Sequence, residues 1–590
     1  MILQALVKYY EDLEKQGKIS RRGWCTEKIS YGIQLSCDGK IQAILSLKRE
    51  VQAGKKTILS PQPLFVPTMV TRSSGVAANF LCDNSKYMLG IDKDGTSKRM
   101  QECFQATKEK HLQILQNSQG ETANAICAFF ESWKPEQAKE NPVVAETWEE
   151  LTEGGNLIFW VNGKYAQEDE EVQKAWEKTQ DQKQGEATGI CLVTGNLDEI
   201  SRIHKNIKGI PGAQSSGASL ISFNEKAFES YGKTQSYNAP VGKYAEFAYT
   251  TSLNYLLTQK KYKFSLGESM VVYWAEGAKT EYQDFFSTFL NPTKDNEDIV
   301  HDILEKLTEG QYIDVKDIKI NKDQKFYVLC LSPNAARLSV RFFYENSFGN
   351  MLENLEKHYQ RLNIPKLKKD EIDYLGVDDL LQETINQRTK NKKAIAHMAA
   401  MVLEAILSDN RYPASLYIDT LIRIRSDQGD VTWGRAAIIK AYLIKNYKWE
   451  EGEACMNSGK TSNDVAFKLG QAFSILEAIQ IGANKINTNK EIKSTIRDRY
   501  FNSACVTPAM VFPILMRLKN SHIRKLERDK PNLAKYYEDR LREIFEEVEY
   551  FPKRLSLEEQ GKFILFDKPL HSHQLHQFQS TLPSRERGLK

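Results

Sequence analysis

The chain has 590 residues, of which 41% are hydrophobic and 27% are charged, and its formal net charge is +4. This length exceeds what one hydrophobic core usually supports, so we expect two or more domains, and the composition excludes a disordered or fibrous chain. The small net charge neither requires nor excludes a nucleic-acid partner, because such binding depends on where Lys and Arg cluster.

Cysteine usage and hydropathy predict a cytoplasmic protein. The nine cysteines form no C-x-x-C pair, so neither a zinc ribbon nor a thioredoxin-like motif is predicted. The sequence has no run of about 18 apolar residues that would predict a membrane span. Its first residues also lack the basic and apolar regions of a secretory signal. We therefore expect no contact with a membrane.

The first 365 residues mix the periodicities of helices and strands. An amphipathic helix is predicted over residues 1–20, and a hairpin over 31–50 turns at Asp38 and Gly39. The further elements predicted are helices at 98–115 and 244–262 and strands at 156–165 and 326–333. This mixture predicts an α+β domain.

After about residue 365 the pattern becomes helical. Successive segments of 3.6-residue period predict a helical region of roughly 200 residues. A small, polar stretch at 455–463 predicts a joint, and the last residues show no apolar period and predict no fixed structure. The predicted division is an α+β domain at 1–365, a first helical part at 366–455, a C-terminal helical bundle at 456–566 and a tail at 567–590.

The sequence gives no indication of catalysis. It contains no G-x-x-x-x-G-K-[ST], H-E-x-x-H or G-x-S-x-G motif and no protein-kinase motif set. The stretch 92–95 begins like a calcium loop but lacks the later acidic ligands, so we interpret it as a surface turn. His571, His573 and His576 lie in the tail, where no predicted element orients them toward a metal. We predict no catalytic residue, no cofactor and no metal.

Four stretches of the N-terminal domain combine small residues and amides with Lys or Arg. Small residues allow a sugar-phosphate chain to approach the backbone, Lys and Arg neutralise phosphates, and Asn and Gln can read base edges. The same small and polar residues also form ordinary turns, and that alternative stays open for any single stretch. Four of them in one domain favour a nucleic-acid partner. The candidate residues are Arg72, Ser74, Gly75 and Asn79 in 71–87, Lys205, Lys208, Gln214, Ser216 and Asn224 in 204–224, Lys233, Gln235 and Asn238 in 230–247, and Arg337 and Arg341 in 331–343.

Two further patterns add candidates. Tyr231 and Tyr237 flank the third stretch and are placed to stack on unpaired bases. Arg337 and Arg341 alternate along a predicted strand, which places both on one face of the sheet. In the helical part the candidates are Arg423, Arg425, Arg517 and Arg524, for which a solvated helix face remains the default alternative.

Several long motifs resemble the large subunit of the type I-C CRISPR Cascade complex. They are "MILQALVKYY" at the start, "RSSGVAANFLCDNSKYMLGID" at 72–92, "CLVTG" at 191–195, "IKGIPGAQSSGASLISFNEKAFESYG" at 207–232, "NAPVG" at 238–242 and "LSPNAARLSVRFF" at 331–343. The similarity runs in the same order from residue 1 to about residue 566.

The resemblance implies a non-catalytic reader and clamp. Members of this family assemble with a crRNA, the repeated backbone subunits, the crRNA-processing subunit and a small subunit, inspect double-stranded DNA for the protospacer-adjacent motif, and help to open the duplex. The assembled complex then recruits a separate helicase–nuclease. Base pairing reads the target, while the protein reads only the short flanking motif and the backbone.

Within the motifs, chemistry assigns the candidate roles. We expect Arg72, Ser74 and Asn79 to contact the flanking duplex, with Gly75 allowing the close approach. The candidates of 204–243 are expected on the duplex or on the crRNA handle, and the four arginines of the helical part on the displaced single strand. Phe80 and Leu81 are predicted to lie in the core.

Three matters are left open by the sequence. In the family the C-terminal helical part is also made alone, from an internal start, and Met456 is the best-placed internal methionine for this. The tail diverges from the family after residue 566, and "FQSTLPSRER" resembles read-through of repeat DNA, so we assign it no function. The rival functions are a crRNA-processing endoribonuclease of the same system and a purely structural assembly scaffold.

Overall fold

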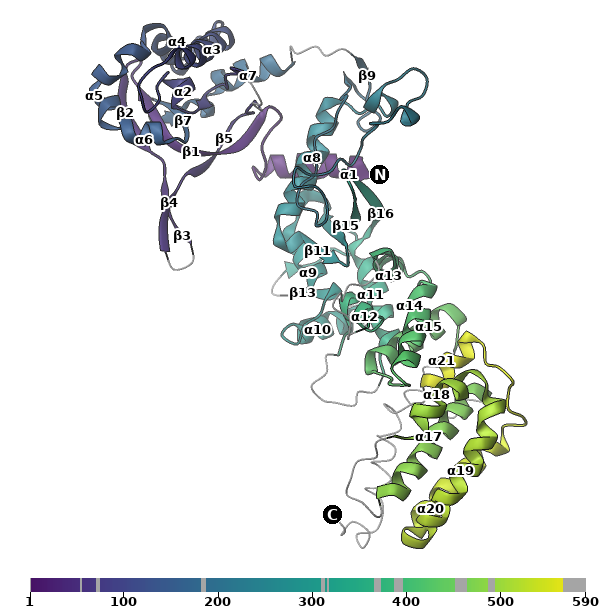
Figure 1. Ribbon diagram of the computed structural model, residues 1–590. Coiled ribbons are helices and arrows are strands. Elements are labelled where there is room, and N and C mark those ends of the chain that lie inside the picture. Colours follow the sequence, from purple (N-terminus) through teal and green to yellow (C-terminus); the bar gives the residue numbers. More distant parts are fainter. Residues whose placement is uncertain are drawn as a thin grey trace. The chain divides into compact units, whose positions relative to one another are not determined.

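The computed structural model describes two compact units (Figure 1). The first comprises residues 3–205 and 222–252, and the second comprises residues 206–221 and 253 onward. Within these units the described residues are 2–53, 56–70, 75–181, 187–308, 314–315, 318–364, 373–386, 396–450, 464–485 and 494–565. An α/β region precedes a helical region, which confirms the predicted α+β class.

The sheet of the first unit is organised around one long strand, β1 (Trp24–Leu35). This strand pairs antiparallel with β2 (Ile41–Ser46) and β5 (Gln62–Pro67) and parallel with β7 (Asn156–Val161), which also pairs with β6 (Cys82–Asp83) and β8 (Lys164–Tyr165). The predicted hairpin is β1–β2, and Gly39 stands in its turn with φ +81°. A Cβ at Gly39 would lie 2.3 Å from the backbone nitrogen of Phe129, so no larger residue fits this turn.

Helices pack on this sheet through an aromatic core. Phe80, Phe104, Phe129, Phe130 and Phe159 all belong to it and are at most 5% exposed. The helical elements around it are α2 (Ser85–Met88), α3 (Lys98–Leu115), α4 (Glu121–Ser132), η1 (Pro135–Glu140), α5 (Pro142–Glu146), α6 (Trp148–Glu153), η2 (Ala166–Glu168) and α7 (Glu170–Asp181). The helix predicted at 98–115 is α3.

The remaining elements of the first unit include the N-terminal helix. The amphipathic helix predicted at the start is α1 (Ile2–Lys15), and the Ser252 hydroxyl donates to the Leu6 carbonyl at 2.9 Å, which joins it to α8 (Lys243–Thr258). The other elements are the hairpin β3 (Arg49–Ala53) and β4 (Lys56–Ser60), the two-stranded sheet β9 (Thr188–Ile190) and β10 (Leu197–Glu199), and the short helices η3 (Lys226–Phe228) and η4 (Gln235–Asn238).

The second unit begins with an antiparallel sheet of four strands. Its order is β11 (Lys263–Leu266), β12 (Ser269–Ala275), β15 (Lys325–Asn334) and β16 (Arg337–Ser347). Every residue of β12 is buried, as expected for a central strand covered on both faces. The neighbouring elements are η5 (Lys260–Tyr262), η6 (Glu276–Ala278), α9 (Thr280–Leu290), α10 (Glu297–Thr308), α11 (Phe348–Leu362) and the two-residue strands β13 (Asp314–Val315) and β14 (Ile318–Lys319).

The helical region shares one hydrophobic core with this sheet. The buried cluster that contains Val271 and Phe326 of the strands continues to Phe563 of the last helix. Its helices are α12 (Val377–Gln382), α13 (Ala396–Ser408), α14 (Ala414–Ser426), α15 (Trp433–Tyr447), α17 (Val465–Lys485), α18 (Ile496–Val506), α19 (Pro508–Asp529), α20 (Pro531–Glu546) and α21 (Leu557–Leu565). This core therefore extends on both sides of residue 365. The predicted domain boundary at that residue stays a prediction.

A buried ion pair fixes two of these helices to each other. The Arg497 guanidinium on α18 donates from Nε to both oxygens of Glu477 on α17, at 3.1 and 3.0 Å, and both side chains are at most 8% exposed. Arg497 Nη1 also donates to the Gly429 carbonyl at 3.1 Å, so the buried charges are hydrogen-bonded as well as paired. The pair fixes the register of α18 against α17.

Candidate nucleic-acid interface

The first candidate loop is anchored on both sides of residues 71–74. Asn79 accepts the Val70 N–H on its side-chain oxygen at 2.8 Å, and its own N–H donates to Asp83 Oδ2 at 3.1 Å. Lys110 Nζ, from α3, donates to the Ala78 carbonyl at 2.7 Å. The two ends of the loop are thereby held together on the sheet and helices of the first unit.

Asn79 is therefore a corrected assignment within this loop. Its side chain is only 1% exposed, and its oxygen is occupied by the Val70 N–H. Burial and this internal hydrogen bond prevent it from reaching a base edge, so we interpret Asn79 as a residue that closes the loop. Phe80 and Leu81 are both fully buried, which confirms their predicted place in the core.

Gly75 is the described residue of the loop that suits a close approach. It is exposed and has φ +86°, and a Cβ built on it would meet no atom of the described residues within 4 Å. Among those residues nothing crowds this backbone, and a side chain here would be disfavoured by its conformation. Arg72 and Ser74 lie outside the described residues, so their predicted contacts with the duplex stay predictions.

His111, a neutral histidine on α3, accepts a hydrogen bond from the backbone at the end of this loop. Leu81, which has φ +60°, donates its N–H to His111 Nε2 at 2.9 Å, and His111 Nδ1 lies 2.7 Å from the Thr107 carbonyl. Because Nε2 accepts, the proton of the neutral ring is on Nδ1. Burial lowers the pKa of His111 to about 3, which keeps the ring uncharged.

Lys205 is an exposed cation on a well-fixed backbone. Its N–H donates to Glu246 Oε1 at 2.7 Å, and its Nζ lies 5.0 Å from the centre of the Phe247 ring. Burial raises the pKa of Glu246, and the Lys205 N–H opposes that rise. The geometry holds the lysine side chain at the surface of α8, as phosphate binding requires.

The third candidate loop is closed by Asn238. This side chain accepts the Ser230 N–H at 2.9 Å and donates to the carbonyls of Lys233 and Gln235 at 2.7 and 2.8 Å. Its polar atoms are used inside the loop, so its role, like that of Asn79, is to shape the turn. Gln235 is half-buried, whereas Lys233 and Asn224 are exposed.

Tyr231 projects from this loop into solvent. Its side chain is 99% exposed, and its backbone has φ +53°, an uncommon conformation for a residue other than glycine. Tyr237, the second tyrosine predicted to stack on a base, is half-buried. Of the two tyrosines, Tyr231 is the one whose ring faces are accessible to an unpaired base.

Two candidate stretches that are far apart in the sequence meet in the second unit. Ser219 donates its N–H to the Ala336 carbonyl at 3.0 Å and accepts the Leu338 N–H at 3.0 Å. Gly217, with φ +92°, lies where a Cβ would approach the Ile207 carbonyl at 2.7 Å, so the turn requires glycine. The exposed side chains of Lys208, Gln214 and Ser216 thus share this region with the β15–β16 end.

A β-bulge separates the two arginines of β16. Cys330 pairs with Phe342 and Leu331 pairs with Val340, so Arg341 has no partner residue across the strands. The bulge interrupts the two-residue alternation on which the prediction of one shared face rested. Arg341 is exposed and donates from Nε to Ser332 Oγ at 2.8 Å, and Arg337 is half-buried.

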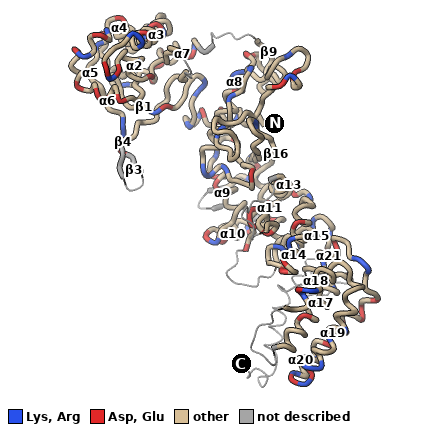
Figure 2. Tube along the Cα trace, viewed as in Figure 1, with Lys and Arg blue, Asp and Glu red and all other residues tan. Residues whose placement is uncertain are grey.

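The four arginines of the helical region divide into two kinds. Arg423 on α14 is 14% exposed and pairs with Asp427 at 3.1 Å, and Arg425 donates to Gln560. Both are half-buried and bound within the protein, and their assignment to the displaced strand stays a prediction. Arg517 and Arg524 on α19 are exposed and pair with no acidic side chain among the described residues. Along α19 most of the basic side chains come first and the acidic Glu527 and Asp529 follow at its end, whereas basic and acidic side chains are mixed along α20 (Figure 2).

Three of the described histidines are buried and held neutral. His111, His204 and His358 are at most 3% exposed, and burial lowers the pKa of each, to about 3, 4 and 3. Within the described ranges no three His, Cys, Asp or Glu side chains gather as metal ligands. In the same part of the chain, no helix has both the length and the apolar character needed to cross a bilayer.

Sequence reasoning missed the residues that hold the loops. Lys110 and His111 bind backbone groups about 30 positions earlier in the chain, and Glu246 binds Lys205 N–H from 41 positions away. The signal available was only that His111 stands on the apolar side of α3.

A comparison with protein-family models matches almost the whole chain to one family. The family model described as CRISPR-associated protein (Cas_Csd1) matches residues 6–566. A search of curated proteins found no match.

Proposed function

The chain belongs to the CRISPR-associated protein (Cas_Csd1) family, and from this we propose that it is the non-catalytic large subunit that recognises the protospacer-adjacent motif for a type I-C Cascade complex. In this role it holds double-stranded DNA beside the motif, aids opening of the duplex and stabilises the displaced strand. Sequence recognition of the target itself is left to the crRNA.

The observation that carries the proposal is the anchored loop at 75–79 within a family motif. Hydrogen bonds from Asn79 and Lys110 fix both sides of residues 71–74, and Gly75 leaves open backbone next to them. A reading loop must be held rigidly, because a base contact is specific only when its donor and acceptor positions are fixed. We propose Arg72 and Ser74 as the residues that contact the motif.

Exposed cations on other loops are proposed to hold the backbone. Lys205 and Lys233 in the first unit, and Lys208 and Arg341 in the second, are exposed. We propose that they bind phosphates of the duplex or of the crRNA handle, with Tyr231 stacking on an unpaired base. Arg517 and Arg524 are the proposed contacts to the displaced strand.

The partners follow from the assembly in which the family works. Family membership implies the other Cascade subunits as partners. We propose in addition that the chain contacts the crRNA and the target duplex and helps to recruit the helicase–nuclease. Met456, the proposed internal start for a separate small subunit, and the tail at 567–590 lie outside the described residues.

A reconstitution with and without this chain tests the proposal. The complex is assembled from crRNA and its subunits, and its affinity is measured for duplexes that differ only in the flanking motif. We expect a preference for the correct motif that disappears when this subunit is omitted. A preference that persists without it would assign motif reading to another subunit and leave a scaffold role.

The endoribonuclease alternative is tested separately. The purified chain is incubated with repeat RNA, and we expect the RNA to remain intact because the proposed role of this subunit is non-catalytic. Cleavage at a single position of the repeat would contradict a non-catalytic role.

A further inference from the structure

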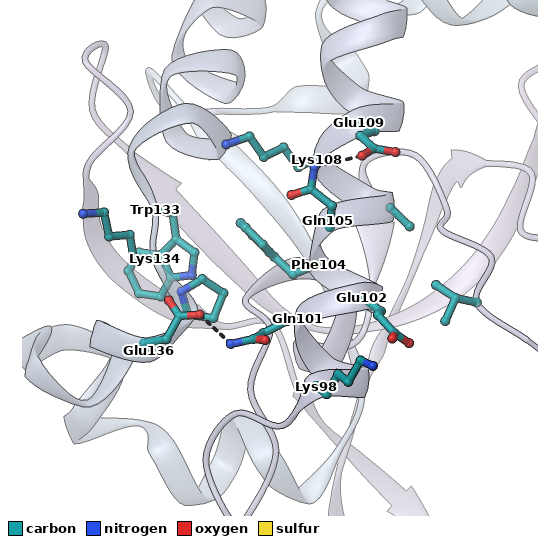
Figure 3. A pocket seen from close by; sticks show the side chains of 13 residues that line it. Lys98, Gln101, Glu102, Phe104, Gln105, Lys108, Glu109, Trp133, Lys134 and Glu136 are labelled. Atoms are coloured by element: carbon teal, nitrogen blue, oxygen red, sulfur yellow. Dashed lines mark hydrogen bonds between the residues drawn. The ribbon is translucent and has the colours of Figure 1, made fainter.

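A hollow lies beside the anchored loop, between α3 and the chain that follows α4. Its volume is about 870 Å³, and Val76 of the loop lines it together with residues of α3 and of the segment 133–136 (Figure 3). Val76 is 37% exposed, so the loop and the hollow form one continuous surface. Any nucleic acid bound at Gly75 would pass close to this hollow.

The apolar side of the hollow is a rigid aromatic platform. Trp133 is half-buried, its Nε1 donates to the Leu89 carbonyl at 3.0 Å, and its ring stacks on Phe129 at 5.7 Å between centres. Pro135 packs closely on Gly90: a Cβ added to Gly90 would lie 2.7 Å from the Cγ of Pro135. A platform of this kind needs no rearrangement before a flat ring stacks on it.

Two amides on α3 are oriented by carboxylates. Gln101 Nε2 donates to Glu136 Oε1 at 2.7 Å, and Gln105 Nε2 donates to Glu109 Oε1 at 2.8 Å (Figure 3). Each amide nitrogen uses one of its two N–H groups in this bond, so each glutamine keeps one N–H donor and its acceptor oxygen. The hollow therefore presents oriented donors and acceptors to the edge of a base.

The charges around the hollow balance. Lys98, Lys108 and Lys134 line it, as do Glu102, Glu109 and Glu136. None of the three lysines forms an ion pair with a residue that the structure describes. A neutral ring is thus favoured inside, while the lysine side chains are long enough to reach phosphates on either side of it.

We propose that this hollow holds one unpaired DNA base from the strand next to the flanking motif. The proposal rests on the proposed function, because only a subunit that opens the duplex would meet such a base. Stacking on Trp133 and hydrogen bonds to Gln101 and Gln105 stabilise the unstacked base, which lowers the cost of opening the first base pair. An aromatic side chain of a partner protein would use the platform but not the unpaired lysines.

Photocrosslinking to 5-iodouracil tests the proposal at single positions. The full complex is bound to duplexes that carry this base at each position next to the motif, both fully paired and with a preformed bubble. We expect one position to crosslink to Trp133, identified by mass spectrometry of the peptide. The variant Trp133→Leu should lose this crosslink, and Trp148→Leu, a half-buried tryptophan elsewhere in the unit, should retain it.

A second variant tests the proposal even if Trp133→Leu fails to fold. Lys98 and Lys134 are exposed, so Lys98→Ala/Lys134→Ala should assemble normally and weaken the crosslink. Lys139→Ala, an exposed lysine 5.0 Å above the Trp148 ring, is its matched control. An abasic nucleotide at the crosslinked position should weaken binding by about fivefold or more in the wild type, the worth of one stacked base.

The outcomes separate this proposal from the proposed function. A crosslink on the bubble but not on the paired duplex would support the hollow and contradict opening by the complex. No crosslink to Trp133 on either substrate would overturn the proposal. The proposal is equally overturned if Trp133→Leu only releases another subunit, because the platform is then a protein contact.

Discussion

At the scale of residues, the candidates differ in whether partners within the protein occupy their polar atoms. Asn79, Asn238, Arg423 and Arg425 have the chemistry of nucleic-acid contacts, yet each is occupied by a hydrogen bond or ion pair within the protein. Amides and guanidiniums satisfy buried backbone groups as well as they bind bases, so residue type alone does not separate the two roles. Burial and partners separate them.

Replacing Asn79 should cost stability before it costs recognition. Asn79→Ala leaves the Val70 N–H without a partner, and we expect the free energy of unfolding to fall by about 1–3 kcal/mol. Asn117→Ala, at an exposed site after α3, is the control and should be neutral. Denaturant unfolding of the purified chain measures both, and an unchanged midpoint for Asn79→Ala would contradict the assigned role.

Buried histidines should make the chain less stable in weak acid. Burial lowers the pKa of His111 to about 3, whereas an unfolded histidine titrates near 6.5. Below about pH 6.5 the unfolded state binds a proton that the folded state does not, so stability falls as the pH is lowered toward 3, by up to ~1.4 kcal/mol per pH unit for this group. His204 and His358 add to the effect in the same direction.

The variant His111→Phe separates the two contributions of this ring. We expect lower stability at pH 7, because the Leu81 N–H loses its acceptor, together with a shallower decline between pH 6.5 and 4. Unfolding is measured at several pH values, with His301→Gln as the control because that side chain is 66% exposed. A decline as steep as in the wild type would show that His111 is not a source of the pH dependence.

At the scale of elements, the candidate surfaces are made where loops are clamped to regular structure. The segment 206–221 is held at the β15–β16 end by Ser219, and Arg341 stands at a bulge of β16. Hydrophobic periodicity predicts strands and helices, but it carries no information about which loop a strand end will hold. The interruption of the Arg337–Arg341 alternation was invisible for the same reason, since one inserted residue leaves the apolar pattern nearly unchanged.

The helix α19 provides a test at this scale. Arg517→Glu/Arg524→Glu should weaken protection of the displaced strand by the assembled complex, and the dependence of log affinity on log salt should fall by roughly 1.4 for two phosphate contacts. Arg540→Glu on α20, where Nη1 lies 2.8 Å from Glu543, changes charge equally per site and is the control. If the control weakens protection as much as the double variant, the effect is one of net charge and α19 is not a contact.

At the scale of the whole molecule, the sequence predicted the fold class, several elements of the N-terminal part and the helical character of the C-terminal part. Helix 98–115 and the hairpin at 31–50 were predicted because their apolar periods and turn residues are local signals. The sequence did not predict that the four-stranded sheet of β11, β12, β15 and β16 shares one core with the helices, because packing of one element on another leaves no period in either. The site was predicted as four loops, but the residues that hold them, such as Lys110, lie far away in the sequence.

The central claim is that Arg72 and Ser74 contact the flanking motif, and one binding measurement tests it most directly. Assembled complexes with wild type, Arg72→Ala or Arg21→Ala are titrated, at fixed salt, with duplexes that carry or lack the motif. We predict that Arg72→Ala assembles but loses about 1–3 kcal/mol of preference, the worth of a base contact, while Arg21→Ala, at a 65% exposed site, retains it. An Arg72→Ala complex with full preference would contradict the claim and make the anchored loop a structural turn.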